Sequence, residues 1–234
     1  MSKGYATAII MAIFIAAAAI AGFVIMDNKM NREKEIIMKE QEIILSDVNF
    51  HLADQSLKEG YYLTTVQIIY DLCSNGFGNT FWYNGTKNIP SLGEIESKIE
   101  ESIKNNAYQG EFIMNGVKIR VDKLSANVNI TDRLTYNISS VISVLKPSTD
   151  GPTTKSGRRD YYGLINVDIP DMIAKGECVI DALSSGLAPN CGSGITIEDG
   201  TEKTIKIKSA SQNYFYDGEK FIQKPFELVI KFKE

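Results

Sequence analysis

The sequence predicts an α+β protein in which a long N-terminal helix precedes a β-rich antiparallel head. Three observations indicate this class. No charged residue occurs from Tyr5 to Met26, no proline or glycine occurs between Gly22 and Gly60, and apolar and polar residues alternate from Tyr108 onward. An uninterrupted stretch favours one continuous helix, and a period of two favours strands.

Composition excludes several functional classes. The chain has 234 residues, 44% hydrophobic and 23% charged, which is typical of a folded protein rather than a disordered one. A net charge of -4 gives no basic field for binding nucleic acid. One histidine and three cysteines leave too few soft ligands for a zinc or iron–sulfur site of familiar spacing. No catalytic motif of the Gly-x-Ser-x-Gly or His-Glu-x-x-His type occurs, so we expect no enzyme, no catalytic residue, no metal and no cofactor.

The apolar run over residues 5–26 is long enough to cross a membrane. As a helix it rises about 33 Å, and a hydrocarbon core is about 30 Å thick. It fits a plain membrane anchor, or a cleaved secretory signal with Ala19-Ile20-Ala21 as the small-residue site. Against the second interpretation, the run continues to Met26 with no polar mature start. Its many alanines favour close helix–helix packing.

A third interpretation rests on the residues before the run. Lys3-Gly4 followed by Tyr5-Ala6-Thr7-Ala8-Ile9-Ile10 resembles the class III signal peptides of archaeal type IV pilins and archaellins. The resemblance covers about 26 residues and implies a leader of residues 1–4, cut by a leader peptidase between Gly4 and Tyr5. The apolar helix then stays on the mature protein. The bacterial branch has a glutamate where this chain has Ile9, so we expect lateral register to come from apolar packing.

The charged stretch after Asp27 is predicted to continue the helix to about residue 60 as an amphipathic segment. Apolar residues recur at Ile37, Ile44, Val48 and Leu52. Such a helix, apolar first and amphipathic second, is what the pilin fold uses. A short coiled-coil stalk is the alternative. His51 lies in this segment without a ligand cluster and is interpreted as structural.

The head is predicted over residues 61–234, with one or two short helices. Residues 61–72 form a helix or a strand, with a helix favoured. Residues 74–90 are turn-rich, and the aromatic residues 81–83 are expected to fold back into the core from a loop. Ser91 and Glu94 form a predicted capping box that opens a helix to about Asn105.

Antiparallel strands are predicted next. Asn115-Gly116 indicates a hairpin with a type I′ turn. Further alternating segments cover residues 126–130, 134–145, 163–169, 204–209 and 226–232. Residues 146–159 are predicted to be an exposed polar loop, in which Arg158-Arg159 is either solvated or contacts a neighbouring subunit.

Cysteines and sequons suggest an extracellular head. A disulfide between Cys178 and Cys191 would stabilise the fold by about 3 kcal/mol, although Cys73 is an alternative partner for either. Asn-x-Ser/Thr glycosylation sequons begin at three asparagines: Asn84, Asn129 and Asn137. Four carboxylates are candidates for a dyad or calcium site, although scattered surface charge is the more common arrangement: Asp168, Asp171, Glu198 and Asp199.

These observations predict a structural subunit of an extracellular pilus-like filament on an archaeal cell surface. We expect it to be inserted in the membrane before assembly and to form a homo-oligomer through its apolar helix. The alternative is a non-polymerising, membrane-anchored surface protein whose head binds a ligand. The lysines and arginines that follow the span favour a cytoplasmic head, which opposes both interpretations, but long domains translocate largely regardless of charge and Lys3-Gly4 resembles a processed leader.

Overall fold

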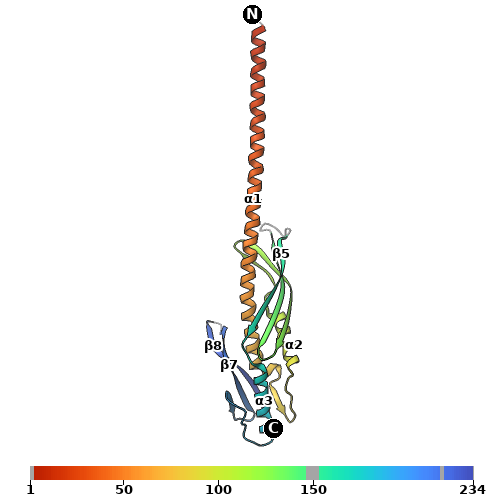
Figure 1. Ribbon diagram of the computed structural model, residues 1–234, viewed down its shortest axis with the longest axis vertical. Helices are drawn as coiled ribbons and strands as arrows, with labels where there is room; N and C mark the ends of the chain where they lie inside the picture. Colours follow the sequence, from red (N-terminus) through yellow and green to blue (C-terminus); the bar gives the residue numbers. More distant parts are fainter. Residues whose placement is uncertain (1–2, 146–152, 217–218, 234) are drawn as a thin grey trace. The chain divides into compact units, whose positions relative to one another are not determined.

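The structure is a computed structural model that describes the backbone of residues 3–145, 153–216 and 219–233. Side chains are described for residues 23–145, 155–215 and 219–233. The chain divides into two compact units, Met1–Asn49 and Phe50–Glu234. A long N-terminal helix and antiparallel β-rich sheets confirm the α+β class (Figure 1).

Helix α1 spans Lys3–Ser74. It therefore continues through Gly60, and residues 61–72 belong to the same helix rather than to a strand or a second helix. From Phe50 onward one face of α1 is buried, with Ala53, Leu57 and Tyr61 following at the spacing of helical turns. This face anchors the end of α1 in the core of the second unit.

One sheet is an antiparallel meander in the order β2-β3-β4-β5. Its strands are β2 (Gly110–Met114), β3 (Val117–Ile130), β4 (Leu134–Leu145) and β5 (Thr153–Ile165). The predicted type I′ turn is present between β2 and β3, because Asn115 has φ 50° and Gly116 has φ 75°. Residues 146–152 of the predicted loop lie outside the described residues. The prediction is wrong for Lys155 to Arg159, which belong to β5.

Helix α2 (Leu92–Asn106) protects an edge of this sheet. It begins with the predicted capping box, in which Ser91 and Glu94 each accept from the other's backbone N–H. Glu96 accepts from the backbone N–H of Ile130, and Glu100 from that of Val128, at 2.7 and 2.9 Å. The two carboxylates therefore accept hydrogen bonds from backbone N–H groups of β3 that would otherwise be available to a neighbouring strand.

The second sheet has the order β1-β8-β7-β6. Its strands are β1 (Phe81–Asn84), β8 (Phe221–Lys233), β7 (Lys203–Tyr216) and β6 (Ile195–Glu198). Strand β1 pairs in parallel with β8, whereas the other pairs are antiparallel. Residues 81–83 are therefore strand rather than loop, although Trp82 is fully buried, as expected of an aromatic core residue.

Helix α3 (Ile169–Ser184) packs on β7 and β8 and was not predicted. Its start signals are in the sequence: Asp168 accepts from the Asp171 N–H at 2.9 Å, and Pro170 follows in the first turn. Gly176 faces the Trp82 ring so closely that a Cβ there would lie 2.7 Å from Cζ3. Glycine thus lets α3 lie directly on the indole.

Candidate functional site

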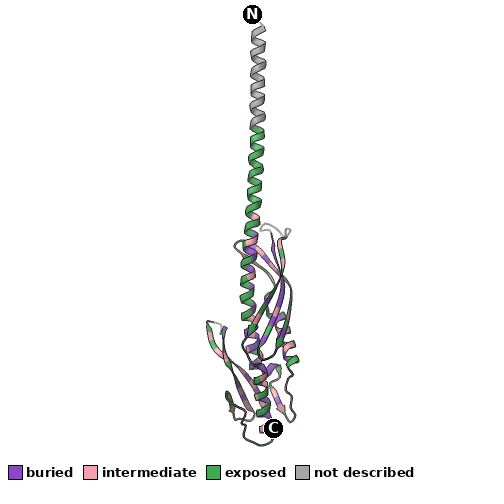
Figure 2. Ribbon diagram, in the orientation of Figure 1, coloured by how far each residue is buried: buried purple, intermediate pink, exposed green. Residues whose placement is uncertain are grey.

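The first candidate surface is the part of α1 from Phe23 to Leu45. Large apolar side chains there are exposed, including Phe23 at 76% and Ile43 at 68% (Figure 2). Two repeats account for most of them: Glu35-Ile36-Ile37-Met38 and, one heptad later, Glu42-Ile43-Ile44-Leu45. At about 100° per residue, each apolar triplet extends over about 200° of the helix circumference. We call residues 23–45 the exposed apolar segment.

Charged residues in this segment pair along the helix itself. Lys39 Nζ lies 3.0 Å from Glu35 Oε1, and Lys29 Nζ lies 3.9 Å from Glu33 Oε1. Exposed pairs of this kind contribute little to stability. Of the two pairs, only Glu35–Lys39 lies on the side of the helix opposite the apolar triplets.

The predicted cleavage site and span fall mostly on residues whose side chains are not described. Gly4 and Tyr5 lie within α1, but the side chains of residues 1–22 are outside the description. Of the span over residues 5–26, only the last four side chains are included. Among the described residues, no helix has a stretch long and apolar enough to cross a membrane.

Cys178 on α3 and Cys191 in the following loop lie at disulfide distance, with their Cα atoms 5.8 Å apart. Cys73 lies in the core instead, is fully buried in α1 and is not their partner. Burial raises the pKa of the Cys73 thiol far above its usual value. A thiol held protonated in this way is a poor nucleophile.

The sequons differ in accessibility. Asn84 is exposed at the end of β1, and Asn129 is exposed on β3. Asn137 on β4 is partly buried, and among the described atoms its Oδ1 has no hydrogen-bond partner. Attachment of a glycan needs an accessible side chain, so the geometry favours Asn84 and Asn129.

The four candidate carboxylates do not converge. Asp168 caps α3, Asp171 pairs with Lys175 at 2.7 Å, and Glu198 pairs with Lys206 at 2.5 Å. In the described parts of the chain no group of three metal-ligating side chains is present. His51 is exposed and meets the edge of the Phe50 ring.

The two arginines have different environments. Arg158 is exposed and lies 3.7 Å from Asp160, its neighbour on β5. Arg159 points toward α1, where its Nε lies 3.3 Å from Asp54 Oδ2 and its guanidinium covers the Phe50 ring. Only Arg158 keeps the exposure that a contact with a neighbouring subunit requires.

Asp54 also accepts a hydrogen bond from the Tyr161 hydroxyl at 2.8 Å. The Tyr161 ring meets Tyr61 edge-on, at 5.2 Å between centroids. Burial raises the pKa of both phenols, and for Tyr161 the bond to the Asp54 carboxylate raises it further. This cluster joins α1 to β5.

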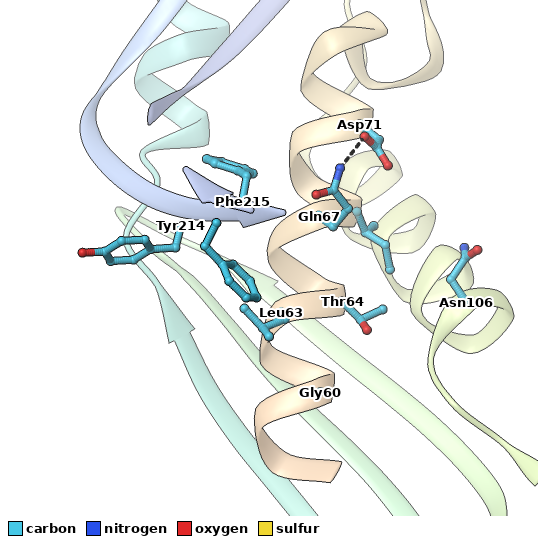
Figure 3. Close-up of a pocket in the computed structure, with 10 residues that line it drawn as sticks. Gly60, Leu63, Thr64, Gln67, Asp71, Asn106, Tyr214 and Phe215 are labelled. Atoms are coloured by element: carbon cyan, nitrogen blue, oxygen red, sulfur yellow. Dashed lines mark hydrogen bonds between the residues drawn. The ribbon is translucent and has the colours of Figure 1, made fainter. Parts of the chain in front are cut away.

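The second candidate surface is a cleft of about 580 Å³ over the exposed side of α1 (Figure 3). We call it the α1 cleft. Its floor is formed by α1, one wall by Asn106 at the end of α2, and the other by β7 and the start of β8. The lining residues are Gly60, Leu63, Thr64, Gln67, Ile68, Asp71, Asn106, Tyr214, Phe215 and Phe221.

Sequence reasoning missed the α1 cleft, because its residues come from three distant parts of the chain. Only the sheet topology brings β7 beside α1, where the Phe215 and Tyr70 rings lie 4.7 Å apart. One signal was available: Gly60 interrupts an otherwise glycine-free helical stretch.

Comparison with protein-family models, with curated proteins and with solved structures finds no match to this chain. The chemistry of both surfaces therefore has to be inferred from their own residues.

Proposed function

We propose that this protein is the structural subunit of an extracellular pilus-like filament, polymerising through its N-terminal helix. The observation that carries the proposal is the exposed apolar segment. Soluble monomers rarely expose contiguous apolar surface of this extent, so a partner that covers it is needed.

The energy scale fits association between copies. Eleven large apolar residues between Phe23 and Leu45 are 45–76% exposed. Covering them at about 25 cal/mol per Å² stabilises an assembly by on the order of 10 kcal/mol per subunit. Association costs about 4–15 kcal/mol, so this segment nearly offsets the cost alone. The residues that precede Phe23 in the sequence are still more apolar, and covering them adds to the free energy of association.

The distribution of apolar residues favours several neighbours over one. A two-stranded coiled coil buries a single seam along each helix. In this segment the apolar triplets extend well beyond one seam, while Glu35, Lys39 and Glu42 lie on the remaining side. A helix surrounded by more than one copy, as in a filament core, covers all three residues of each triplet.

The Lys3-Gly4 motif supports export by the class III route, with cleavage after Gly4 and membrane insertion before assembly. The Cys178–Cys191 pair suits an oxidising exterior, and Asn84 and Asn129 suit glycosylation there. A non-polymerising anchored surface protein is the second candidate, and the α1 cleft is the observation that favours it.

Two measurements test the proposal. Mass spectrometry of the native protein should find Tyr5 as the first residue, and electron microscopy of sheared cells should find filaments that contain this chain. A mature start at Met1 or Gly22, or release as monomers by detergent alone, would contradict it.

A matched pair of substitutions tests the assembling surface. Ile44→Glu should abolish filaments, because it places a carboxylate within the apolar triplet. Lys39→Glu changes the charge by more, but lies on the side of Glu35 and Glu42, so filaments should persist. Equal filament yields for the two variants would show that the segment is not the contact.

A further inference from the structure

We propose that the α1 cleft binds a neutral saccharide chain. This inference does not depend on filament assembly, because every lining residue belongs to the unit Phe50–Glu234. It rests on three features: an unfilled floor, an exposed aromatic ring at the start of β8, and polar groups that accept hydrogen bonds without a basic residue among the lining residues.

The floor is open because residue 60 is glycine. A Cβ at Gly60 would meet no atom within 4 Å, so the packing of the chain itself does not require glycine. In a helix interior glycine costs about 1 kcal/mol relative to alanine. What glycine provides here is depth, because a side chain at residue 60 would project into the cleft. A volume of about 580 Å³ falls in the range of small-molecule sites.

The wall opposite Asn106 presents aromatic surface to solvent. Phe221, at the start of β8, is 55% exposed although it is large enough to gain from burial. Tyr214 contributes to the rim of this wall, and its ring points away from α1 (Figure 3). The faces of aromatic rings carry partial negative charge and attract polarised hydrogens. The C–H groups on the flat side of a pyranose are such hydrogens, so the Phe221 ring suits a sugar.

The polar groups of the cleft are mainly acceptors. Gln67 Nε2 donates to Asp71 Oδ1 at 3.0 Å, and Asn106 Nδ2 donates to the Ser102 carbonyl at 2.8 Å. These bonds fix the side chains of Gln67, Asp71 and Asn106, and each side chain uses one of its two polar atoms. The second oxygen of Asp71 and the amide oxygens of Gln67 and Asn106 are therefore acceptors for hydroxyl groups.

Charge selects against anionic ligands. The lining residues include no lysine or arginine, and Asp71 is their one charged group. Lys224 lies behind this wall, 3.7 Å from the centre of the Tyr70 ring and 5.2 Å from that of Phe215. A phosphate, sulfate or uronic acid would face the Asp71 carboxylate with no cationic side chain among the lining residues, whereas neutral hydroxyls would donate to it.

The test uses the full-length chain in detergent micelles and three neutral tetrasaccharides, built from glucose, mannose or N-acetylglucosamine. A sulfated tetrasaccharide serves as the anionic comparison. Ligand-observed saturation-transfer NMR detects contact, and calorimetry gives the affinity. We expect at least one neutral probe to bind with Kd of about 1 mM or tighter, and the sulfated probe to bind more weakly.

Two variants locate the binding, and one serves as control. Gly60→Leu fills the floor, and Phe221→Ser removes an exposed ring, so each should weaken binding by about tenfold or more. Tyr162→Ala removes a tyrosine of similar size that is 72% exposed on β5, outside the cleft, and should bind as the parent chain does. The unfolding midpoint of Gly60→Leu should stay equal or rise, since leucine is the better helix former.

Four results would overturn the proposal: no saturation transfer to any neutral probe at about 10 mM, unchanged affinity in both cleft variants, equal loss in Tyr162→Ala, or stronger binding of the sulfated probe. If no probe binds and Gly60→Leu instead prevents filament assembly, the cleft is a contact between copies and the saccharide site is refuted. Saccharide binding by a chain that forms no filaments would support this site and refute only the filament.

Discussion

The substitution Gly163→Ala, which adds one methyl group, should test the packing between β4 and β5. Tyr136 on β4 is paired across the strands with Gly163 on β5. A Cβ at residue 163 would lie 2.1 Å from Tyr136 Cζ and 2.3 Å from Cε1 and Oη. The ring therefore lies flat over the glycine, and Gly163→Ala cannot be accommodated without moving it.

The size of the effect follows from these distances. Ordinary contact between carbon atoms is about 3.5–4.0 Å, so the ring must move by roughly 1.4 Å or swing outward. Tyr136 is only 5% exposed. Overpacking costs about 1–3 kcal/mol, and partial loss of ring burial adds to it, so we expect about 3 kcal/mol. For a chain of this size the midpoint of thermal unfolding falls by about 10 °C.

The sole tryptophan gives the assay. Trp82 is fully buried, so its emission shifts to longer wavelength on unfolding. The matched control is Gly157→Ala on the same strand, where a Cβ would lie 3.2 Å from Phe50 Cζ and the cost should be below about 1 kcal/mol. In a Tyr136→Ala background, Gly163→Ala should cost almost nothing. The reasoning is refuted if the two glycine substitutions destabilise equally, or if the Tyr136→Ala background leaves the cost unchanged.

Three further outcomes are expected. Burial raises the pKa of Tyr136 to about 12, above the value near 10 that the phenol has in an unfolded chain. The contribution of the neutral phenol to the free energy of unfolding should therefore be fully present below pH 10 and be lost as the pH rises toward 12. Unfolding titrations at these pH values should show a shallower fall in stability for Tyr136→Phe. Reduction of Cys178–Cys191 should lower the free energy of unfolding by about 3 kcal/mol, measured with and without dithiothreitol. Ser91→Ala should cost about 1 kcal/mol through loss of the α2 cap, and Ser91→Asp should retain the parent stability in the same denaturant titration.

Features governed by neighbouring residues were predicted well from the sequence. The α2 capping box needs only Ser91 and Glu94, and the β2–β3 turn needs only Asn115-Gly116, because each hydrogen bond or dihedral involved lies within four residues. The continuity of α1 followed from an absence of helix breakers, whereas its end at about residue 60 was wrong, because Gly60 does not stop the helix before Ser74.

Features that depend on distant residues were not predictable. The four residues of β1 show no period and predict a loop, whereas their strand state depends on pairing with β8, nearly at the other end of the chain. Helix α3 was missed because Gly163 to Ile169 alternates as a strand does, which concealed the cap at Asp168. In each case a tertiary partner decided between two locally acceptable structures.

The two proposals make separate demands on α1, which explains an otherwise inconsistent pattern of side chains. Between Phe23 and Leu45 the helix exposes bulky residues where a soluble helix would be polar. At Gly60 it has no side chain where alanine would be more stable and would fit. Neither choice improves the stability of the isolated chain. Exposed bulk suits a surface that becomes covered by further copies, and an unfilled floor suits a cleft that becomes occupied by a ligand. Because the two surfaces lie in different units, Ile44→Glu should abolish filaments without changing saccharide affinity, and Gly60→Leu should do the reverse.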